Sequence, residues 1–192
     1  MIAQTVFSLV LCGAVLAGVS QETGNIFDAK AKKDFDQRVG EYVKLRKTAR
    51  EGLHKLKPTK SPGTIETHEK GLAHRIRELR RDARQGDIFT PDVCAEFRRL
   101  IGITMQGEEA MRIRRSLRRA EPVHLKTLRV NRSYPAGVPL QSTPPTLLLN
   151  LPKLAPEVEY RFVGRALILR DVEANLVVDF IPDAIPLNSH AS

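Results

Sequence analysis

The sequence predicts an α+β fold, with helices in the N-terminal half and a sheet at the C-terminal end. Between residues 26 and 121 the apolar residues recur at steps of three and four, which is typical of helices. From residue 158 to residue 181 they alternate instead, which is typical of strands. Nine of the twelve prolines lie at or after Pro122, so a change in composition separates the two patterns.

These patterns divide the chain into five parts. We expect a signal peptide at 1–20, a basic helical region at 26–121 and a proline-rich connector at 122–156. A β-meander at 157–186 and a disordered tail at 187–192 follow. The expected fold is an N-terminal antiparallel helical hairpin plus a third helix, then the connector, then a three-stranded antiparallel β-meander.

The first twenty residues indicate export. They contain no charged side chain, and Val6 to Val19 form an apolar run. The run has the length of a signal-peptide core and is short for a membrane span. We therefore expect cleavage and a periplasmic or extracellular location. No Lys or Arg precedes the run, so an uncleaved N-terminal anchor remains the alternative. Cleavage would leave Cys94 as the only cysteine, and no intrachain disulfide could form.

Two helices joined by a short turn are expected first, as an antiparallel hairpin. From Asp34 onward, apolar side chains recur at helical spacing between lysines and arginines. Residues 57–63 hold two prolines and a glycine, which predict the turn. Ser61 and Pro62 are suited to cap and begin the second helix. The apolar seam of the second helix consists of Ile65, His68, Leu72, Ile76, Leu79 and Ala83.

A third helix is expected to begin at Thr90 and Pro91, a cap residue followed by a proline at the first helical position. Gly102 and Gly107 weaken this helix, so we expect a break or kink near them. Cys94 falls within the helical pattern and is interpreted as a small packing residue rather than a nucleophile.

The connector and the meander follow. Six prolines between Tyr134 and Pro156 predict an extended segment, whose apolar residues 147–149 are expected to dock on the rest of the protein. The meander is expected to have one apolar face, with turns at Gly164 and at Asn175, which suits a left-handed backbone. Three strands are marginal alone, so the meander must pack on the helices or on another copy. The expected buried side consists of Tyr160, Phe162, Leu167, Leu169, Val178 and Phe180.

The positive charge lies in the helical region. The formal net charge is +9. Residues 26–121 hold 24 Lys/Arg against 15 Asp/Glu, whereas residues 122–192 hold 7 against 6. A localised basic surface favours phosphates, acidic lipids or acidic polysaccharides as partners, and arginine binds such anions through paired donors. The candidate anion-binding residues are Arg75, Arg77, Arg80, Arg81, Arg84, Arg112, Arg114, Arg115, Arg118 and Arg119.

Other chemistries lack their signatures. His68 and His74 are six residues apart, which places them on different faces of a helix, so they do not form a local zinc site. The sequence contains neither a nucleophile elbow nor a phosphate-binding glycine loop. Nucleic-acid binding normally adds aromatic stacking or a recognition motif, and neither is found here. We therefore expect no catalytic residue, metal site or cofactor, and nucleic acid is disfavoured as a partner.

The stretch LPKLAPEVEYRFVGRALILRDVEANLVVDFI (151–181) resembles the end of periplasmic RcnB-like proteins, which are linked to nickel and cobalt homeostasis. Those proteins also have a Leu-Pro-rich lead, then Tyr-Arg, an aromatic residue, Val and Gly, and two apolar strands around a short loop. The resemblance implies a periplasmic hairpin module and a link to metal homeostasis. The whole chain also resembles exported bacterial proteins of unknown function. The matching residues are Leu151, Pro152, Tyr160, Arg161, Phe162, Val163, Gly164, Leu167, Ile168, Leu169, Ala174 and Asn175.

The sequence thus predicts a non-catalytic exported envelope protein that binds an anionic surface or a protein partner through its basic helices. Anionic lipid and polysaccharide are the candidate ligands, and the β-meander is a candidate surface for a protein partner or for self-association. Two alternatives remain open. One is a periplasmic metal-homeostasis or stress factor, and the other is an enzyme with dispersed catalytic residues. A basic face that only solvates the helices would explain the charge without any ligand.

Overall fold

The computed structural model of the chain describes residues 27–53, 60–106, 111, 115, 128–134 and 148–186. Within these residues three helices precede a three-stranded antiparallel sheet, so the predicted α+β fold is confirmed. The expected signal peptide (1–20) and tail (187–192) lie outside the described residues, as do 122–127 and 135–147 of the connector. The elements are α1 (Ala29–Glu51), α2 (Pro62–Leu79), α3 (Pro91–Thr104), β1 (Val158–Val163), β2 (Ala166–Asp171) and β3 (Leu176–Ile181).

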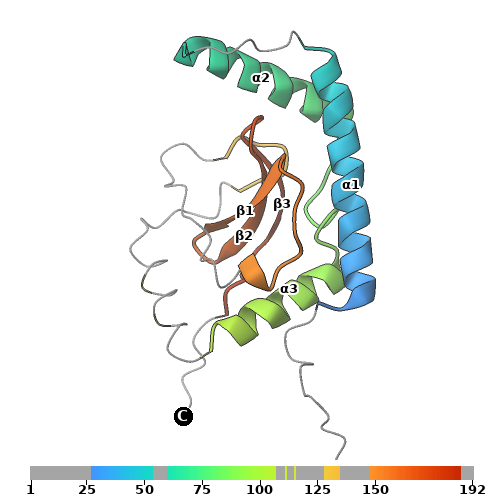
Figure 1. Cartoon of the computed structure of the whole chain (residues 1–192), viewed down its shortest axis with the longest axis vertical. Coiled ribbons are helices and arrows are strands. Elements are labelled where there is room, and N and C mark those ends of the chain that lie inside the picture. The colour runs from blue at the N-terminus through green and yellow to red at the C-terminus, as the bar shows by residue number, and fades with distance from the viewer. Residues whose placement is uncertain are drawn as a thin grey trace, which may run out of the picture.

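Figure 1 shows α1 along one side of the molecule, with α2 across one end of it, α3 across the other end and the sheet between them. Aromatic rings fill the centre of this arrangement, with centroids of contacting rings 5.2 to 6.4 Å apart. They come from α1, α3, the loop before α3, and β1, so one core joins the helices to the sheet. The rings are Phe35, Phe89, Phe97 and Tyr160.

Helix α1 begins five residues earlier than the expected start at Asp34. The side chain of Asp28 accepts a hydrogen bond from the Ala31 N–H at 2.8 Å and caps the helix. The extra turn is held by packing, because Ala31 and the preceding Phe27 are both buried in the core. The helix ends before Gly52, whose N–H bonds to the carbonyl of Arg50.

Helices α1 and α2 contact each other where α2 runs across the C-terminal end of α1 (Figure 1). The side chain of Leu53 lies against Gly71. One turn further back on α1, Ala49 accepts a hydrogen bond from the Arg75 side chain at 2.8 Å. The turn residues 54–59 lie outside the described part of the chain. Pro62 opens α2 as expected, but the Ser61 side chain makes no capping hydrogen bond.

Helix α3 opens at Pro91 as expected and ends at Thr104, two residues after Gly102. The expected cap at Thr90 takes a different form. Its hydroxyl makes no hydrogen bond to the helix and instead donates to Asp34 of α1 at 2.9 Å. This bond links the start of α3 to α1. Of the residues around the second glycine, 107–110 are not described.

The sheet has the strand order β1-β2-β3, and its two turns lie where the sequence placed them. Gly164 and Asn175 have φ values of 57° and 49°, so both adopt the left-handed backbone that these turn positions favour. Strand β3 also pairs at its outer edge with the segment around Ser133, whose neighbours exchange backbone hydrogen bonds with Val177.

The expected place of Phe180 on the buried helix-facing side is wrong. Leu169 pairs with Asp179 whereas Arg170 pairs with Val177, so Val178 is an extra residue in β3. Such a bulge reverses the alternation of side chains along the rest of the strand. Phe180 therefore packs on the opposite face of the sheet, and Ile181 takes the place on the helix-facing side.

The expectation of one apolar face is also corrected. The second face buries Ala166, Ile168 and Val177, which pack against Leu128 and Tyr134. The connector therefore contributes to a second, smaller core.

The expected docking of residues 147–149 is not observed for the two that are described. Leu148 and Leu149 are 43% and 83% exposed. Leu151 is buried in the main core instead. Leu147 lies outside the described residues.

Candidate functional site

Two of the predicted anion-binding arginines on α2 are occupied by internal carbonyls. The Nε atom of Arg75 donates to the carbonyl of Ala49 in α1 at 2.8 Å. The Nε atom of Arg77 donates to the carbonyl of Asn131 at 2.7 Å. Both arginines thus connect α2 to segments that are distant in the sequence.

Arg80 is the most deeply integrated of the predicted arginines. Its two terminal nitrogens donate to the carbonyl of Val178 at 3.2 Å, and its guanidinium lies 5.1 Å from the ring centroid of Tyr42. Burial lowers the pKa of Arg80. The carbonyl of the bulged residue Val178 accepts hydrogen bonds from this side chain, so Arg80 links the C-terminal end of α2 to β3.

The other predicted arginines are exposed or lie outside the described part of the chain. Arg81, Arg84 and Arg115 are exposed. Among the described residues, the side chains of Arg81 and Arg84 have no ion-pair or hydrogen-bond partner. The structure therefore brings Arg75, Arg77 and Arg80 into internal contacts and leaves Arg81 and Arg84 facing solvent. The predicted residues that are not described are Arg112, Arg114, Arg118 and Arg119.

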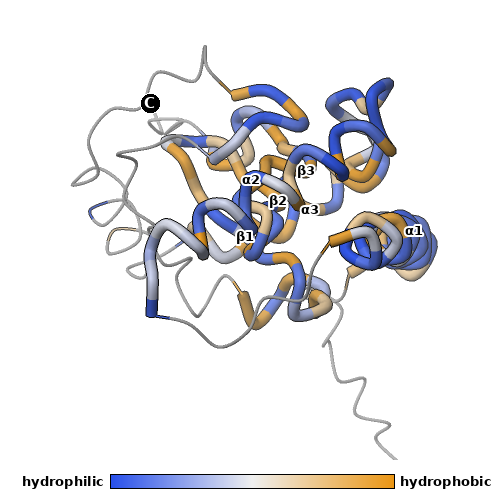
Figure 2. Tube along the Cα trace, turned by 90° about the horizontal axis from the view of Figure 1, so that it is seen from above, coloured by the Kyte–Doolittle hydropathy of each residue, from blue (hydrophilic) through white to orange (hydrophobic). Residues whose placement is uncertain are grey.

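Helix α1 carries a second basic surface, which sequence analysis did not single out. All five of its lysines are exposed, and all except Lys32 have no ion-pair partner among the described residues. These four lysines form the surface. At 100° per residue they fall within about 100° of arc, on the side of the helix opposite to its buried residues. Figure 2 shows α1 end-on and hydrophilic on the side away from the sheet. We call these residues, Lys30, Lys33, Lys44 and Lys47, the lysine face.

An apolar groove runs beside this lysine face. It has a volume of about 740 Å³ and lies between α1 and residues 150–155. This volume is within the range of small-molecule sites. Phe35, Val39 and Val43 line it from α1, and Leu151 and Pro152 line it from the other wall. The full lining is Phe27, Lys32, Phe35, Asp36, Val39, Gly40, Val43, Lys44, Asn150, Leu151, Pro152, Lys153 and Ala155.

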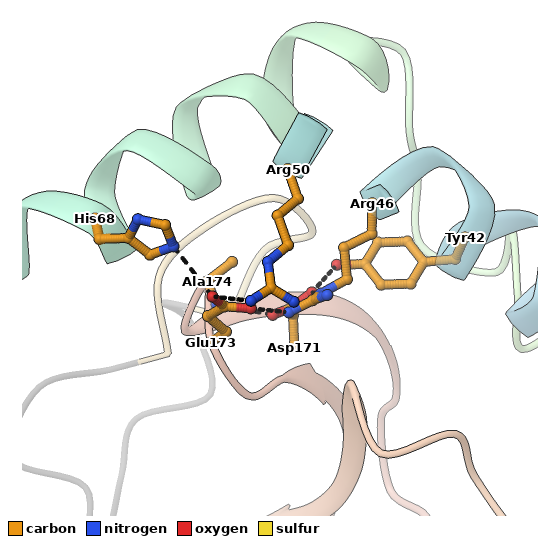
Figure 3. A network of polar contacts seen from close by, with 7 residues as sticks. All are labelled: Tyr42, Arg46, Arg50, His68, Asp171, Glu173 and Ala174. Atoms are coloured by element: carbon orange, nitrogen blue, oxygen red, sulfur yellow. Dashed lines mark hydrogen bonds and ion pairs between the residues drawn. The ribbon is translucent and has the colours of Figure 1, made fainter. Parts of the chain in front are cut away.

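A buried ion pair fixes α1 to the sheet. Figure 3 shows Arg46 and Tyr42 pointing from α1 toward Asp171 at the end of β2. The Nε of Arg46 and the hydroxyl of Tyr42 each donate to Oδ2 of Asp171 at 2.7 Å. The other carboxylate oxygen accepts from the N–H of Ala174 at 2.8 Å. Because Arg46 and Asp171 are both buried, this pair is a structural contact rather than an accessible site.

Glu173 extends the network toward the molecular surface. It accepts a hydrogen bond from Arg46 at 2.5 Å, and Nε2 of His68 lies 3.1 Å from its other oxygen (Figure 3). The Nη2 atom of Arg50 lies 3.6 Å from the same Glu173 oxygen that His68 contacts. Burial opposes ionisation of Glu173, but the hydrogen bonds from Arg46 and His68 outweigh it and lower the pKa of the carboxyl. The predicted seam residue His68 is thus half-buried, with a polar partner.

The lowered pKa of Glu173 predicts a pH-dependent stability. A carboxyl group with a depressed folded-state pKa stabilises the fold above its unfolded pKa, near the usual value of 4.5, and loses that contribution as the pH falls through the folded pKa. We expect the melting temperature of Glu173→Gln to fall less between pH 5 and pH 3 than that of the unchanged protein. Calorimetry across this range measures it, and equal slopes for both proteins would contradict it.

A second buried carboxylate, Asp179, organises the loop between α2 and α3. It accepts hydrogen bonds from the N–H groups of Gly86, Ile88 and Phe89 at 2.8 to 3.2 Å. The N–H of Phe180 adds a further bond at 2.8 Å. Burial raises the pKa of Asp179, and the backbone donors act in the opposite direction.

Cys94 and the two described histidines, His68 and His74, do not form a reactive cluster. Burial raises the pKa of the Cys94 thiol, and its Sγ lies 3.1 Å from the carbonyl oxygen of Phe89. A raised pKa disfavours the thiolate, which is the nucleophilic form. In the described ranges, no three His, Cys, Asp or Glu residues are grouped so that they could hold a metal ion.

Comparison with known protein families, curated proteins and solved structures found no match to this chain. The resemblance to RcnB-like proteins therefore stays a prediction. Among the helices that the structure describes, none combines the length and apolar character needed to cross a membrane.

Proposed function

We propose that this protein binds an anionic lipid surface through the lysine face of α1. The observation that supports the proposal most directly is the contrast between two basic surfaces. On α2 and at its C-cap, Arg75, Arg77 and Arg80 are engaged by the protein's own carbonyls. On α1, the four lysines point away from the core and have no ion-pair partner among the described residues.

Charges without internal partners are available to an external anion. Lysine keeps its ammonium group in water at the end of a flexible chain, so it suits an extended anionic surface better than one fixed ligand. An anionic membrane attracts each nearby lysine by about 1 kcal/mol. The apolar groove and the exposed Leu148 and Leu149 favour lipid over polysaccharide, because a sugar polymer offers much less apolar surface than acyl chains do.

The proposal places the protein outside the cytoplasm, since the first twenty residues predict export. Its ligand there would be the anionic lipid of an envelope membrane. The metal-homeostasis alternative rests on the C-terminal resemblance, and a thermal shift with nickel or cobalt would test it. The enzyme alternative has no specific observation in its favour.

We expect a variant with glutamine at all four positions of the lysine face to bind phosphatidylglycerol vesicles more weakly at low salt. The substituted residues are Lys30, Lys33, Lys44 and Lys47. The loss should be about two to three orders of magnitude, because each lysine contributes roughly fivefold. Binding of the unchanged protein should fade as salt is raised, since screening shortens the range of the attraction. Co-sedimentation with vesicles, and separately with anionic polysaccharide, measures both effects.

A matched variant separates the lysine face from net charge. Replacing Lys60, Lys70, Arg81 and Arg84 with glutamine removes the same charge from the α2 side of the molecule. We expect this variant to retain most of the vesicle binding. If it loses binding while the lysine variant keeps it, the exposed basic residues on the α2 side are the binding surface. If the unchanged protein binds only the polysaccharide, the lipid assignment is wrong.

A further inference from the structure

We propose that the groove beside α1 holds one acyl chain of an anionic lipid, with the lipid headgroup between Lys44 and Lys153. The inference rests on the proposed function and adds a defined site to it. Electrostatic attraction to a membrane needs no groove, so the proposed function and the acyl-chain site can be tested separately.

The groove is built from two neighbouring rows of α1 side chains. Residues four apart on a helix form a continuous ridge. Phe35, Val39 and Val43 form an apolar ridge that serves as the floor. The adjacent ridge borders the groove and consists of Lys32, Asp36, Gly40 and Lys44. An apolar floor behind a polar border suits a ligand with an apolar body and a charged end.

Gly40 opens the border at its centre. It lies at the middle of α1, where glycine is among the least favourable residues. A Cβ atom at this position would meet no atom within 4 Å, so packing does not require a glycine here. Its backbone is helical, so no special conformation requires one either. The missing side chain leaves a gap in the border that gives access to Val39 and Val43.

The charges along the groove favour an anionic ligand. Lys32 is paired with Asp36 at 2.5 Å, so these two charges cancel. Lys44 and Lys153 remain, and neither has an ion-pair partner among the described residues. The lining therefore carries a net charge of +2, from one lysine on each wall. A phosphate group between them would be stabilised from both sides.

The neighbourhood of the groove points to a membrane as the source of the lipid. Leu148 and Leu149 precede the lining residue Asn150 and are 43% and 83% exposed. Exposed apolar side chains next to lysines are typical of segments that lie in a membrane interface. If Leu148 and Leu149 inserted into the interfacial region of the membrane, they would bring the mouth of the groove to the acyl chains.

The test compares two leucine variants. Gly40→Leu places a side chain in the gap, and Gly102→Leu makes the same change in α3, away from the groove, where a Cβ atom also meets nothing within 4 Å. Both variants gain helix propensity, so both should fold, with melting temperatures up to about 2–4 °C higher than that of the unchanged protein. Calorimetric titration with lauroyl lysophosphatidylglycerol, below the concentration at which it forms micelles, measures binding of a single chain.

We expect Gly40→Leu to weaken binding of this lipid by at least about tenfold, because its side chain occupies space that several methylene groups would fill. Gly102→Leu should bind like the unchanged protein. The variant in which glutamine replaces both Lys44 and Lys153 should bind lauroyl lysophosphatidylglycerol only as strongly as the unchanged protein binds lauroyl lysophosphatidylcholine. The headgroup of the second lipid has no net charge. Glycerol phosphate, the headgroup without a chain, should not bind measurably.

Three results would overturn the inference. Equal binding by Gly40→Leu and the unchanged protein would mean that the chain lies elsewhere. Salt-sensitive binding to vesicles without binding of the monomeric lipid would remove the groove and leave the proposed function intact, whereas absence of vesicle binding would remove the proposed function itself. A dimer that Gly40→Leu converts to a monomer in sedimentation equilibrium would assign the groove to a second copy of the chain.

Discussion

Asp171→Ala is expected to destabilise the fold by about 3–5 kcal/mol, because it removes one partner of a buried ion pair and leaves the buried Arg46 with only the partly exposed Glu173 as a carboxylate partner. Arg46 is 4% exposed, and its Nε donates to the carboxylate of Asp171. The hydroxyl of Tyr42 and the N–H of Ala174 lose their acceptor in the same substitution. Urea denaturation followed by circular dichroism measures the loss.

The pair can be tested by removing both partners. Arg46→Met together with Asp171→Leu is expected to cost much less than the sum of the two single substitutions, since neither buried charge remains and the partly exposed Glu173 keeps His68 and Arg50 as partners. Lys70→Met provides the control, because its ion pair with Glu66 is exposed, and it should leave the denaturation midpoint unchanged. A loss for Asp171→Ala of less than about 0.5 kcal/mol, typical of surface substitutions, would show that the pair does not hold α1 to the sheet.

Asp179→Ala is expected to cost about 3 kcal/mol or more. The substitution leaves the N–H groups of Gly86, Ile88 and Phe89 without their acceptor, and an unsatisfied buried donor costs about 1–3 kcal/mol. The loop between α2 and α3 should open as a consequence. Hydrogen exchange of these amides measures the local effect, and urea denaturation measures the global one.

Asp179→Asn separates hydrogen bonding from packing. Both carboxylate oxygens accept from backbone N–H groups, and an amide would direct its own N–H₂ group at some of these donors. Asparagine has nearly the same shape as aspartate, so a mainly steric role would leave it almost neutral. We expect it to be nearly as destabilising as alanine. A neutral asparagine variant would contradict the role of Asp179 as the acceptor that organises the loop.

Most of the secondary structure could be predicted from the sequence, because its signals are local. Pro62 and Pro91 begin helices where a proline at the first helical position predicts them. Gly164 and Asn175 form turns because their backbones adopt positive φ. The alternation of β1 and β2 predicted the helix-facing residues Tyr160 and Leu169 correctly.

The prediction failed at Phe180 because a bulge is decided by the partners of a strand. The alternation continues through β3 in the sequence, and nothing within the strand marks Val178 as extra. In the folded protein, Arg80 binds the carbonyl of Val178, and the loop before α3 binds the carboxylate of Asp179. The two partners lie 98 and 90 residues earlier in the chain.

The candidate sites also combine features that the sequence predicted with features that only the fold revealed. Composition identified a basic helical region, but a count of arginines and lysines does not distinguish those bound to internal carbonyls from those facing solvent. The buried carboxylates of Asp171 and Asp179 carried no signal, because an aspartate in a strand becomes notable only when its partners are known. The sequence also did not mark Gly40 as part of a site, since a groove needs the second wall that residues 150–155 supply.

The sequence by itself determined the order of helices and strands, the positions of two turns and the half of the chain that carries the charge, because backbone propensity and hydrophobic period act over a few residues. Only the tertiary structure decided which basic side chains remain available, where β3 bulges and that a groove lies beside α1. These features depend on contacts between segments far apart in the chain, where burial and hydrogen-bond satisfaction select among conformations that local signals leave equivalent.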